Sequence, residues 1–230
     1  MKTIGLVGGM SWESTAHYYA LLNKLVNERL GAHHSARLLL YSIDFEELER
    51  RQFAGEWDEA GEIVVEAAKR LERGGADFLL ICANTMHIAA EQVEQAVGIP
   101  LLHIADAAGE RMVARNVRRV GLLGTAFTME RDFYKNRLRE RFGLDVMVPG
   151  ADRRQLLHGI IFNELVAGIV RPESKTKLRE VIASLEKAGA EGILLGCTEL
   201  MMILGQADSA VPLFDTTGIH CEAAVNLALA

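Results

Sequence analysis

Three cysteines carry the strongest chemistry in this chain, and their surroundings differ. Cys197 lies in the run Gly196-Cys-Thr-Glu199, where apolar residues give way to polar ones. An ionised thiol at such a junction can act as an acid or base at carbon, whereas Cys82 ends an apolar run and Cys221 lies inside the expected last helix, places that favour packing. Because the cysteines are odd in number and lack paired spacing, the sequence predicts neither a disulfide framework nor a zinc site.

The segment around Cys197 is repeated earlier in the chain. Residues 71–85, Leu-Glu-Arg-Gly-Gly-Ala-Asp-Phe-Leu-Leu-Ile-Cys-Ala-Asn-Thr, match residues 185–199 at a constant offset of 114 (185 minus 71). This offset aligns Ala83 with Cys197, so one half has a methyl group where the other has a thiol. A second match, between residues 5–10 and 121–126, has an offset of 116 (121 minus 5). The two matches indicate a duplicated fold with one reactive position in each half.

Short apolar runs alternate with longer helical patterns along the chain. Apolar runs without alternation predict parallel strands that are covered on both faces, at residues 3–7, 38–42, 78–82, 120–123, 192–195 and 211–214. Apolar residues at spacings of three and four predict helices over residues 13–30, 56–73, 129–142 and 173–188, with stops at Gly31, Gly74 and Gly189.

This order of elements predicts an α/β fold with right-handed crossovers. We expect two pseudo-symmetric lobes, each with a parallel sheet flanked by helices, and a site in the cleft between them. The first lobe is predicted to comprise residues 1–114 plus 212–230, and the second to comprise residues 115–211, with a join near residues 111–118.

Ligands of open parallel sheets bind beyond the carboxyl ends of the strands, where free backbone N–H groups favour an anion. Four strand-to-turn junctions offer small or hydroxyl residues there: Gly8-Gly-Met-Ser11, Ala83-Asn-Thr85, Gly124-Thr-Ala-Phe-Thr128 and Gly196-Cys-Thr-Glu199. None of the glycine turns matches the dinucleotide fingerprint or the phosphate loop. A small carboxylate therefore suits these junctions better than a nucleotide does.

Composition restricts the classes of function. The chain has 230 residues, of which 50% are apolar and 24% charged, as is typical of a globular protein with a sizeable core. A formal net charge of -6 and a pI near 5.7 make nucleic acid and anionic membrane poor partners. The N-terminal apolar stretch is too short for a signal peptide, so we expect a cytoplasmic protein. Nothing in the sequence requires pyridoxal phosphate, a nucleotide or a metal, and a homodimer is the general expectation.

Four motifs in the right order resemble the aspartate/glutamate racemase family, most closely its broad-specificity and acidic amino-acid racemases. They are Gly8-Gly-Met-Ser11, Asn84-Thr-Met-His87, Gly196-Cys-Thr-Glu199 and Phe214-Asp-Thr-Thr-Gly-Ile-His220, and the likeness spans essentially the whole chain. The resemblance implies a cofactor-independent racemase in which a cysteine from each lobe faces the substrate α-carbon from opposite sides. One thiolate removes the α-proton, and the other thiol returns a proton to the opposite face.

One position departs from the family pattern. The family's first cysteine directly precedes Asn-Thr, and this position is Ala83 here, which cannot itself act as an acid or base. A branch of the family has threonine at this position. Cys82 is one residue earlier, and its side chain should point to the opposite face of the strand unless a bulge redirects it. We therefore interpret Cys82 as a buried packing residue.

Cys197 is the expected catalytic acid or base. An expected helix start after it predicts that the helix dipole and backbone amides lower the pKa of the thiol toward neutrality. The developing carbanion also requires donors to the substrate carboxylate, and the candidates are Asn84, Thr85, Thr125, Thr128 and Thr198.

The family resemblance adds residues that line the pocket. It implies that Met10 and Ser11 lie in the pocket and that Gln52 or Arg51 contacts the distal group of the substrate. Met10 is equally suited to packing, and Arg51 to a solvated helix face. A neutral amide at Gln52 would tolerate more substrate side chains than an arginine clamp. His87 and His220 are interpreted as structural.

Three functions remain open from the sequence. The first is an amino-acid racemase for acidic or broad-range substrates, in which Cys197 serves one face and water or an unidentified group serves the other. The second is a one-thiol relative, such as a malonate-type decarboxylase or an isomerase, for which one proton donor suffices. The third is a non-catalytic carboxylate-binding protein, and retention of the Asn84-Thr-Met-His87 motif argues against it.

Overall fold

The computed structural model describes residues 1–230. The chain divides into two compact units, which we call unit 1 (residues 1–104 and 220–230) and unit 2 (residues 105–219). Both chain ends belong to unit 1, where the N–H of Lys2 donates to the carbonyl of Ala228 at 2.9 Å. No helix in either unit combines the length and the apolar character needed to cross a membrane.

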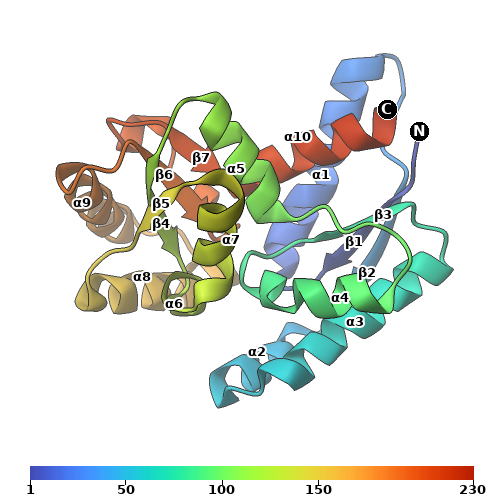
Figure 1. Cartoon of the computed structure of the whole chain (residues 1–230), viewed down its shortest axis with the longest axis horizontal. Helices are drawn as coiled ribbons and strands as arrows, with labels where there is room; N and C mark the ends of the chain where they lie inside the picture. The colour runs from blue at the N-terminus through green and yellow to red at the C-terminus, as the bar shows by residue number, and fades with distance from the viewer. The chain divides into compact units, whose positions relative to one another are not determined.

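Unit 1 is built on a parallel sheet with the order β2-β1-β3 (Figure 1). One face packs against α1 and the C-terminal helix α10, and the other packs against α2, α3 and α4. The bounds are β1 (Ile4–Gly8), α1 (Trp12–Leu30), β2 (Leu38–Ser42), α2 (Phe45–Ala54), α3 (Trp57–Arg73), β3 (Phe78–Ile81), the 3-10 helix η1 (Thr85–Ala89), α4 (Ala90–Ala96) and α10 (Thr216–Leu229).

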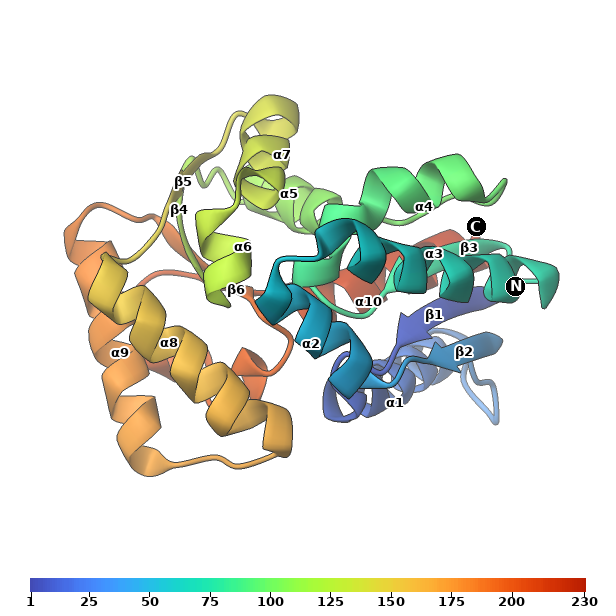
Figure 2. The ribbon, with the colours of Figure 1, turned by 90° about the horizontal axis from the view of Figure 1, so that it is seen from below.

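Unit 2 is built on a second parallel sheet with the order β5-β4-β6-β7. Figure 2 shows α8 and α9 side by side in this unit. The bounds are α5 (Ile104–Ala114), β4 (Arg119–Gly124), α6 (Ala126–Glu130), α7 (Asp132–Phe142), β5 (Asp145–Met147), α8 (Ala151–Asn163), η2 (Leu165–Ala167), α9 (Pro172–Lys187), β6 (Gly192–Gly196), η3 (Leu200–Met202), η4 (Gln206–Asp208) and β7 (Leu213–Asp215).

The two sheets share one register, as the repeat in the sequence predicts. Ile4 of β1 pairs with Phe78 of β3, and the residues 116 and 114 positions later, Val120 and Gly192, pair in the same way. A single parallel bridge from Leu79 to Leu101 in unit 1 corresponds to the pairing of β6 with β7 in unit 2. The α/β fold with two parallel sheets is therefore confirmed, and Ala83 and Cys197 follow equivalent strands.

The predicted lobe boundaries, 1–114 plus 212–230 and 115–211, differ from the two units. The strand at 213–215 belongs to unit 2 because β7 hydrogen-bonds to β6. Helix α5 also belongs almost entirely to unit 2, because Asp106 accepts two hydrogen bonds from Arg137 of α7 at 2.6 and 2.7 Å. A Cβ at Gly109 would meet the ring of Phe142 at 2.4 Å, so α5 packs closely on α7.

Most predicted strands and helices are present with small shifts at their ends. The predicted helix over 129–142 is wrong in one respect, because Arg131 adopts an extended conformation (φ -75°, ψ 152°) that separates α6 from α7. Gly31 and Gly74 cap the C-terminal ends of α1 and α3 as predicted, while Ala188 caps α9, just before Gly189 at φ 98°. Strand β5 was not predicted, since three residues are too few to form a pattern.

Candidate active site

The turn after β1 requires glycine and is fixed by a hydroxyl. Gly9 has φ 91°, and a Cβ at this position would lie 2.2 Å from the carbonyl oxygen of Ile43, so only glycine fits here. Its N–H donates to Oγ1 of Thr15 at 2.9 Å. Ser11 caps α1 through its side chain. Met10 and Ser11, both predicted to line the pocket, are buried at this turn.

The segment after β3 lies against the same part of unit 1. Ala83 and Asn84 are buried, and Ala83 shares a hydrophobic cluster with Met10 and Met86. The side-chain amide of Gln52, reaching from α2, donates to the sulfur of Met86 at 3.0 Å. Met10 and Ala83 thus belong to one hydrophobic cluster of unit 1, and Gln52 contacts this cluster through Met86.

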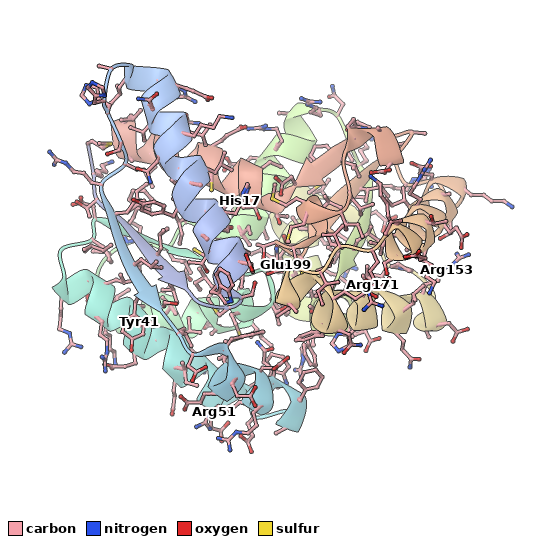
Figure 3. All side chains as sticks on the ribbon, turned by 180° about the vertical axis from the view of Figure 1, so that it is seen from behind. His17, Tyr41, Arg51, Arg153, Arg171 and Glu199 are labelled. Atoms are coloured by element: carbon pink, nitrogen blue, oxygen red, sulfur yellow. The ribbon has the colours of Figure 1, made fainter.

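Arg51 behaves differently from its neighbour Gln52. Its guanidinium lies within 3.4 Å of Glu47 and 3.7 Å of Glu56, two largely exposed carboxylates (Figure 3). Of the two residues that the resemblance offers for the distal group of the substrate, only Gln52 is buried next to the Asn84 segment. The Arg51 side chain is 26% exposed and pairs with these carboxylates.

Cys82 and Cys221 are packing residues, as expected. Both are fully buried in the cluster between the sheet of unit 1 and helices α1 and α10, whereas Ala83 belongs to the cluster on the other face. The N–H of Cys82 continues the sheet ladder by donating to Val7 at 2.9 Å, so no bulge redirects its side chain. Burial raises the pKa of the Cys82 thiol far above its ordinary value.

In unit 2, the turn after β4 is held by two threonines. Oγ1 of Thr125 accepts the N–H of Thr128 at 3.2 Å and lies 3.2 Å from its hydroxyl. The N–H of Ala126 donates to Nδ1 of His158, which reaches over from α8, at 3.2 Å. Burial lowers the pKa of His158, which favours this neutral acceptor. The first amide of α6 is therefore bonded within the unit, and the threonine hydroxyls remain the candidate donors to a ligand.

Cys197 follows β6 and forms a compact cluster with its two neighbours. Its Sγ donates to Oε2 of Glu199 at 3.0 Å, and Oγ1 of Thr198 donates to the same oxygen at 2.9 Å. All three side chains are buried, with exposed fractions of 7, 4 and 3% for Cys197, Thr198 and Glu199. Glu199 is labelled in Figure 3.

The expectation of a lowered thiol pKa at Cys197 is wrong. Burial and the carboxylate of Glu199 instead raise the pKa of the Cys197 thiol well above its ordinary value. The predicted helix start is also absent, because only the three-residue turn η3 follows, which has little dipole to offer. Cys197 is thus a protonated thiol at rest, and Glu199 is placed to accept its proton.

Sequence reasoning did not include Glu199 among the site residues. The signal was its place two residues after the thiol, at the end of a strand, where both side chains can turn toward one point. The motif Phe214-Asp-Thr-Thr-Gly-Ile-His220 proves to be an anchor for α10. Asp215 accepts the N–H groups of Thr217 and Gly218 at 3.0 and 3.1 Å, and the hydroxyl of Thr216 donates to Leu195 at 2.7 Å. No group of three histidine, cysteine or carboxylate side chains is arranged to hold a metal ion.

Comparison with known proteins agrees with the motifs. Residues 7–224 match the model of the Asp/Glu/Hydantoin racemase family. The broad specificity amino-acid racemase RacX of Bacillus subtilis (strain 168) is 24% identical to this chain over 233 residues, which cover 99% of this chain and 98% of RacX.

Solved structures give the same result. A candidate Asp/Glu racemase from Yersinia pestis has 45% identity and a TM-score of 0.92, with both chains fully covered. An aspartate racemase homologue from Pyrococcus horikoshii OT3 has 38% identity and a TM-score of 0.86, again over both full chains. A glutamate racemase from Francisella tularensis, at 16% identity and a TM-score of 0.71, covers 99% of this chain and 81% of its own and shares the fold. The chain therefore belongs to the Asp/Glu/hydantoin racemase family and is an isomerase of the racemase type, which in this family works without pyridoxal phosphate.

Proposed function

We propose that this chain racemises amino acids without any cofactor, acting on acidic or broad-range substrates, with Cys197 as the acid and base at the α-carbon. The observation that carries the proposal is the buried contact of 3.0 Å between Sγ of Cys197 and Oε2 of Glu199, at the carboxyl end of β6. The relative RacX, which is named as a broad specificity amino-acid racemase, supports a broad substrate range.

In this proposal Glu199 accepts the thiol proton when substrate is bound. The thiolate of Cys197 then takes the α-proton of the amino acid and becomes a thiol again, while the substrate becomes a carbanion. Return of a proton to the same face restores the starting amino acid, and delivery to the opposite face inverts it. The carbanion needs hydrogen-bond donors on its carboxylate, because a thiolate is a weak base for a C–H proton. The proposed donors are Asn84, Thr85, Thr125, Thr128 and Thr198.

The proton for the opposite face needs a separate source. Ala83 occupies the position equivalent to Cys197 and has no exchangeable proton, and the thiol of Cys82 is buried on the other face of the sheet. In the proposal, water or an unidentified group supplies this proton. Met10 and Ser11 line the pocket, and the neutral amide of Gln52 accepts several kinds of substrate side chain.

The lack of a thiol at Ala83 also favours a second candidate function. An isomerase that uses a single thiol needs one proton donor only, so Cys197 and Glu199 would suffice for it. Toward amino acids, a single working thiol would exchange the α-proton while retaining the configuration.

The discriminating experiment uses a panel of L- and D-amino acids in deuterated buffer, with α-deuterium followed by mass spectrometry and configuration by chiral chromatography. Deuterium incorporation with inversion is the expected result. Incorporation with retention would favour the one-thiol isomerase. A purified, folded protein that exchanges the α-proton of no amino acid in the panel would contradict both functions.

A further inference from the structure

Three histidines pack together in the interior of unit 1, and the proposed reaction uses none of them. The ring centroids of His87 and His103 are 4.4 Å apart, and those of His87 and His220 are 6.0 Å apart. All three side chains are buried. Such buried imidazoles need hydrogen-bond partners for their ring nitrogens, and those partners reveal what the cluster holds in place.

His87 joins two separate backbone segments through its ring. Nε2 lies 3.1 Å from the backbone nitrogen of Ile104, and Nδ1 lies 2.7 Å from the carbonyl oxygen of Ala83. A backbone N–H can only donate, so Nε2 must be the bare acceptor nitrogen. A carbonyl can only accept, so Nδ1 must carry the proton. The two bonds together assign His87 as the neutral Nδ1–H tautomer.

The bond to Ala83 fixes the orientation of the peptide that follows it. In a planar trans peptide the C=O and the N–H point in opposite directions. Because His87 holds the carbonyl of Ala83, the N–H of Asn84 must point away from the histidine. Asn84 is one of the residues proposed to bind the substrate carboxylate, so the direction of this amide matters for the reaction.

His220 ties further segments to the same cluster. Its Nε2 lies 2.8 Å from the carbonyl of Leu102 and therefore donates to it, which leaves Nδ1 to accept the hydroxyl proton of Tyr18 at 3.0 Å. The chain passes from unit 1 to unit 2 after Ile104 and returns at His220. Through His220, the backbone at Leu102 is bonded to α10, where the chain returns to unit 1. The same histidine bonds α10 to Tyr18 of α1, the helix that begins after Ser11.

We propose that His87 is a positioning residue for the racemase reaction. It orients the Ala83–Asn84 peptide and links this peptide to the backbone at Ile104, where the chain leaves unit 1. This inference rests on the proposed function, because it assigns a purpose to the orientation of Asn84. It assigns His87 no contact with the substrate. The donor nitrogen Nδ1 is the atom on which the reaction depends, and the acceptor nitrogen Nε2 serves the fold.

Two substitutions separate these roles. His87→Asn keeps a donor near the position of Nδ1 and loses the acceptor for Ile104, whereas His87→Gln keeps an acceptor near Nε2 and loses the donor to Ala83. Both remove the ring, so both lose stability by creating a similar void. Val26→Ala, at a fully buried position in the cluster between the sheet and helices α1 and α10, is the control for lost stability alone.

The expected result is a split between the two variants. Under folded conditions, kcat/KM for α-proton exchange should fall about tenfold or more in His87→Gln and remain within about threefold of the unaltered protein in His87→Asn, as suits the loss of one oriented donor. Val26→Ala should retain kcat/KM. Equal losses in both histidine variants, or a loss confined to His87→Asn, would overturn the positioning role.

A measurement on the unliganded protein keeps this inference separate from the proposed function. Nitrogen-15 NMR of the imidazoles should show His87 as the neutral Nδ1–H tautomer at neutral pH, and the amide signal of Asn84 should move in His87→Gln more than in His87→Asn. An Nε2–H tautomer at His87 overturns the inference whatever the activity. If no amino acid is exchanged but these signals are as expected, the proposed function fails and the peptide-orienting role of His87 stands.

Discussion

At the residue scale, the three cysteines differ through their neighbours rather than through their burial. Cys82, Cys197 and Cys221 are all buried, and burial raises the pKa of the thiol in both Cys82 and Cys197. Cys197 has the carboxylate of Glu199 within hydrogen-bond distance. A thiolate beside a carboxylate is disfavoured at rest, yet the same carboxylate is the group that can take the proton away. Glu199 therefore stabilises the thiol and provides its route to ionisation.

The substitution Glu199→Gln tests both halves of this argument. Removal of the negative charge and of the acceptor should lower the pKa of the Cys197 thiol, although burial still keeps it above the ordinary value. Alkylation by iodoacetamide, measured against pH in a Cys82→Ala, Cys221→Ala background, should therefore have its inflection at lower pH in Glu199→Gln. We expect kcat for α-proton exchange to fall by about tenfold or more despite the larger thiolate fraction, because the proton acceptor is lost. An inflection that stays in place or moves to higher pH would contradict the assigned role.

Ala83→Cys tests whether the second proton limits inversion. A thiol at the position equivalent to Cys197 should raise the rate of inversion relative to the rate of exchange, measured by chiral chromatography and mass spectrometry on the same samples. Ala83→Val is the matched control, because it adds similar volume at this buried site without an exchangeable proton. A folded Ala83→Cys variant whose ratio equals that of Ala83→Val would show that the missing thiol is not limiting.

At the scale of elements, turns at the strand ends bring the site residues of unit 1 together. The turn after β1 passes so close to the backbone of Ile43 that Gly9 has no room for a Cβ. The capping bond of Ser11 fixes the start of α1, and the contact of Gln52 in α2 with Met86 in η1 joins two predicted site segments. The geometry of the site therefore depends on backbone packing as much as on the predicted donors.

Gly9→Ala should destabilise unit 1 by about 3 kcal/mol or more, because a positive φ and a backbone clash act together. Gly55→Ala is the control: its backbone is left-handed (φ 79°, ψ 11°), but no atom lies within 4 Å of the added Cβ. That variant should lose only about 1 kcal/mol. Urea unfolding of both variants checks the difference, and equal losses would show that the close approach at Ile43 does not limit this turn.

His220 gives the helix α10 a dependence on pH. Burial lowers the pKa of His220 from 6.5 to about 4, so the unfolded chain binds a proton at this site more readily than the folded chain does. Its contribution to stability is therefore complete above about pH 6.5 and is lost as the pH falls toward 4; the difference in pKa corresponds to about 3 kcal/mol. Urea unfolding should find that the advantage of the unaltered protein over His220→Gln shrinks across this range. A constant advantage would contradict the assignment of a neutral, buried His220.

The elements differ in how well the sequence could predict them. Continuous apolar runs predicted six of the strands, and β1, β3, β4 and β6 among them are largely buried, whereas the three-residue β5 left no such pattern. At Arg131 the backbone becomes extended and separates α6 from α7, although the sequence pattern on both sides is helical. The motifs predicted Cys197, but the direction of its pKa depended on burial and on the rotamer of Glu199, which follow only from packing.

At the scale of the whole molecule, the two units share one strand register, while the position of Ala83 in one corresponds to Cys197 in the other. The pairs Ile4 with Phe78 and Val120 with Gly192 preserve the repeat that the sequence predicts. The boundaries of the units could not be predicted in the same way, because the contact between α5 and α7 joins residues about thirty positions apart by shape and charge. Divergence at Ala83 leaves one half with the thiol chemistry, which makes Cys197 the residue on which the whole account depends.

The most direct test compares Cys197→Ala with Cys82→Ala in α-proton exchange. Both substitutions remove a buried thiol and leave a small void, so any shared loss reflects packing alone. For the amino acid that the unaltered protein turns over fastest in deuterated buffer, we expect Cys197→Ala to lose at least about a thousandfold in exchange rate and Cys82→Ala to remain within a few-fold. A folded Cys197→Ala variant that exchanges the α-proton at the rate of the unaltered protein would contradict the account.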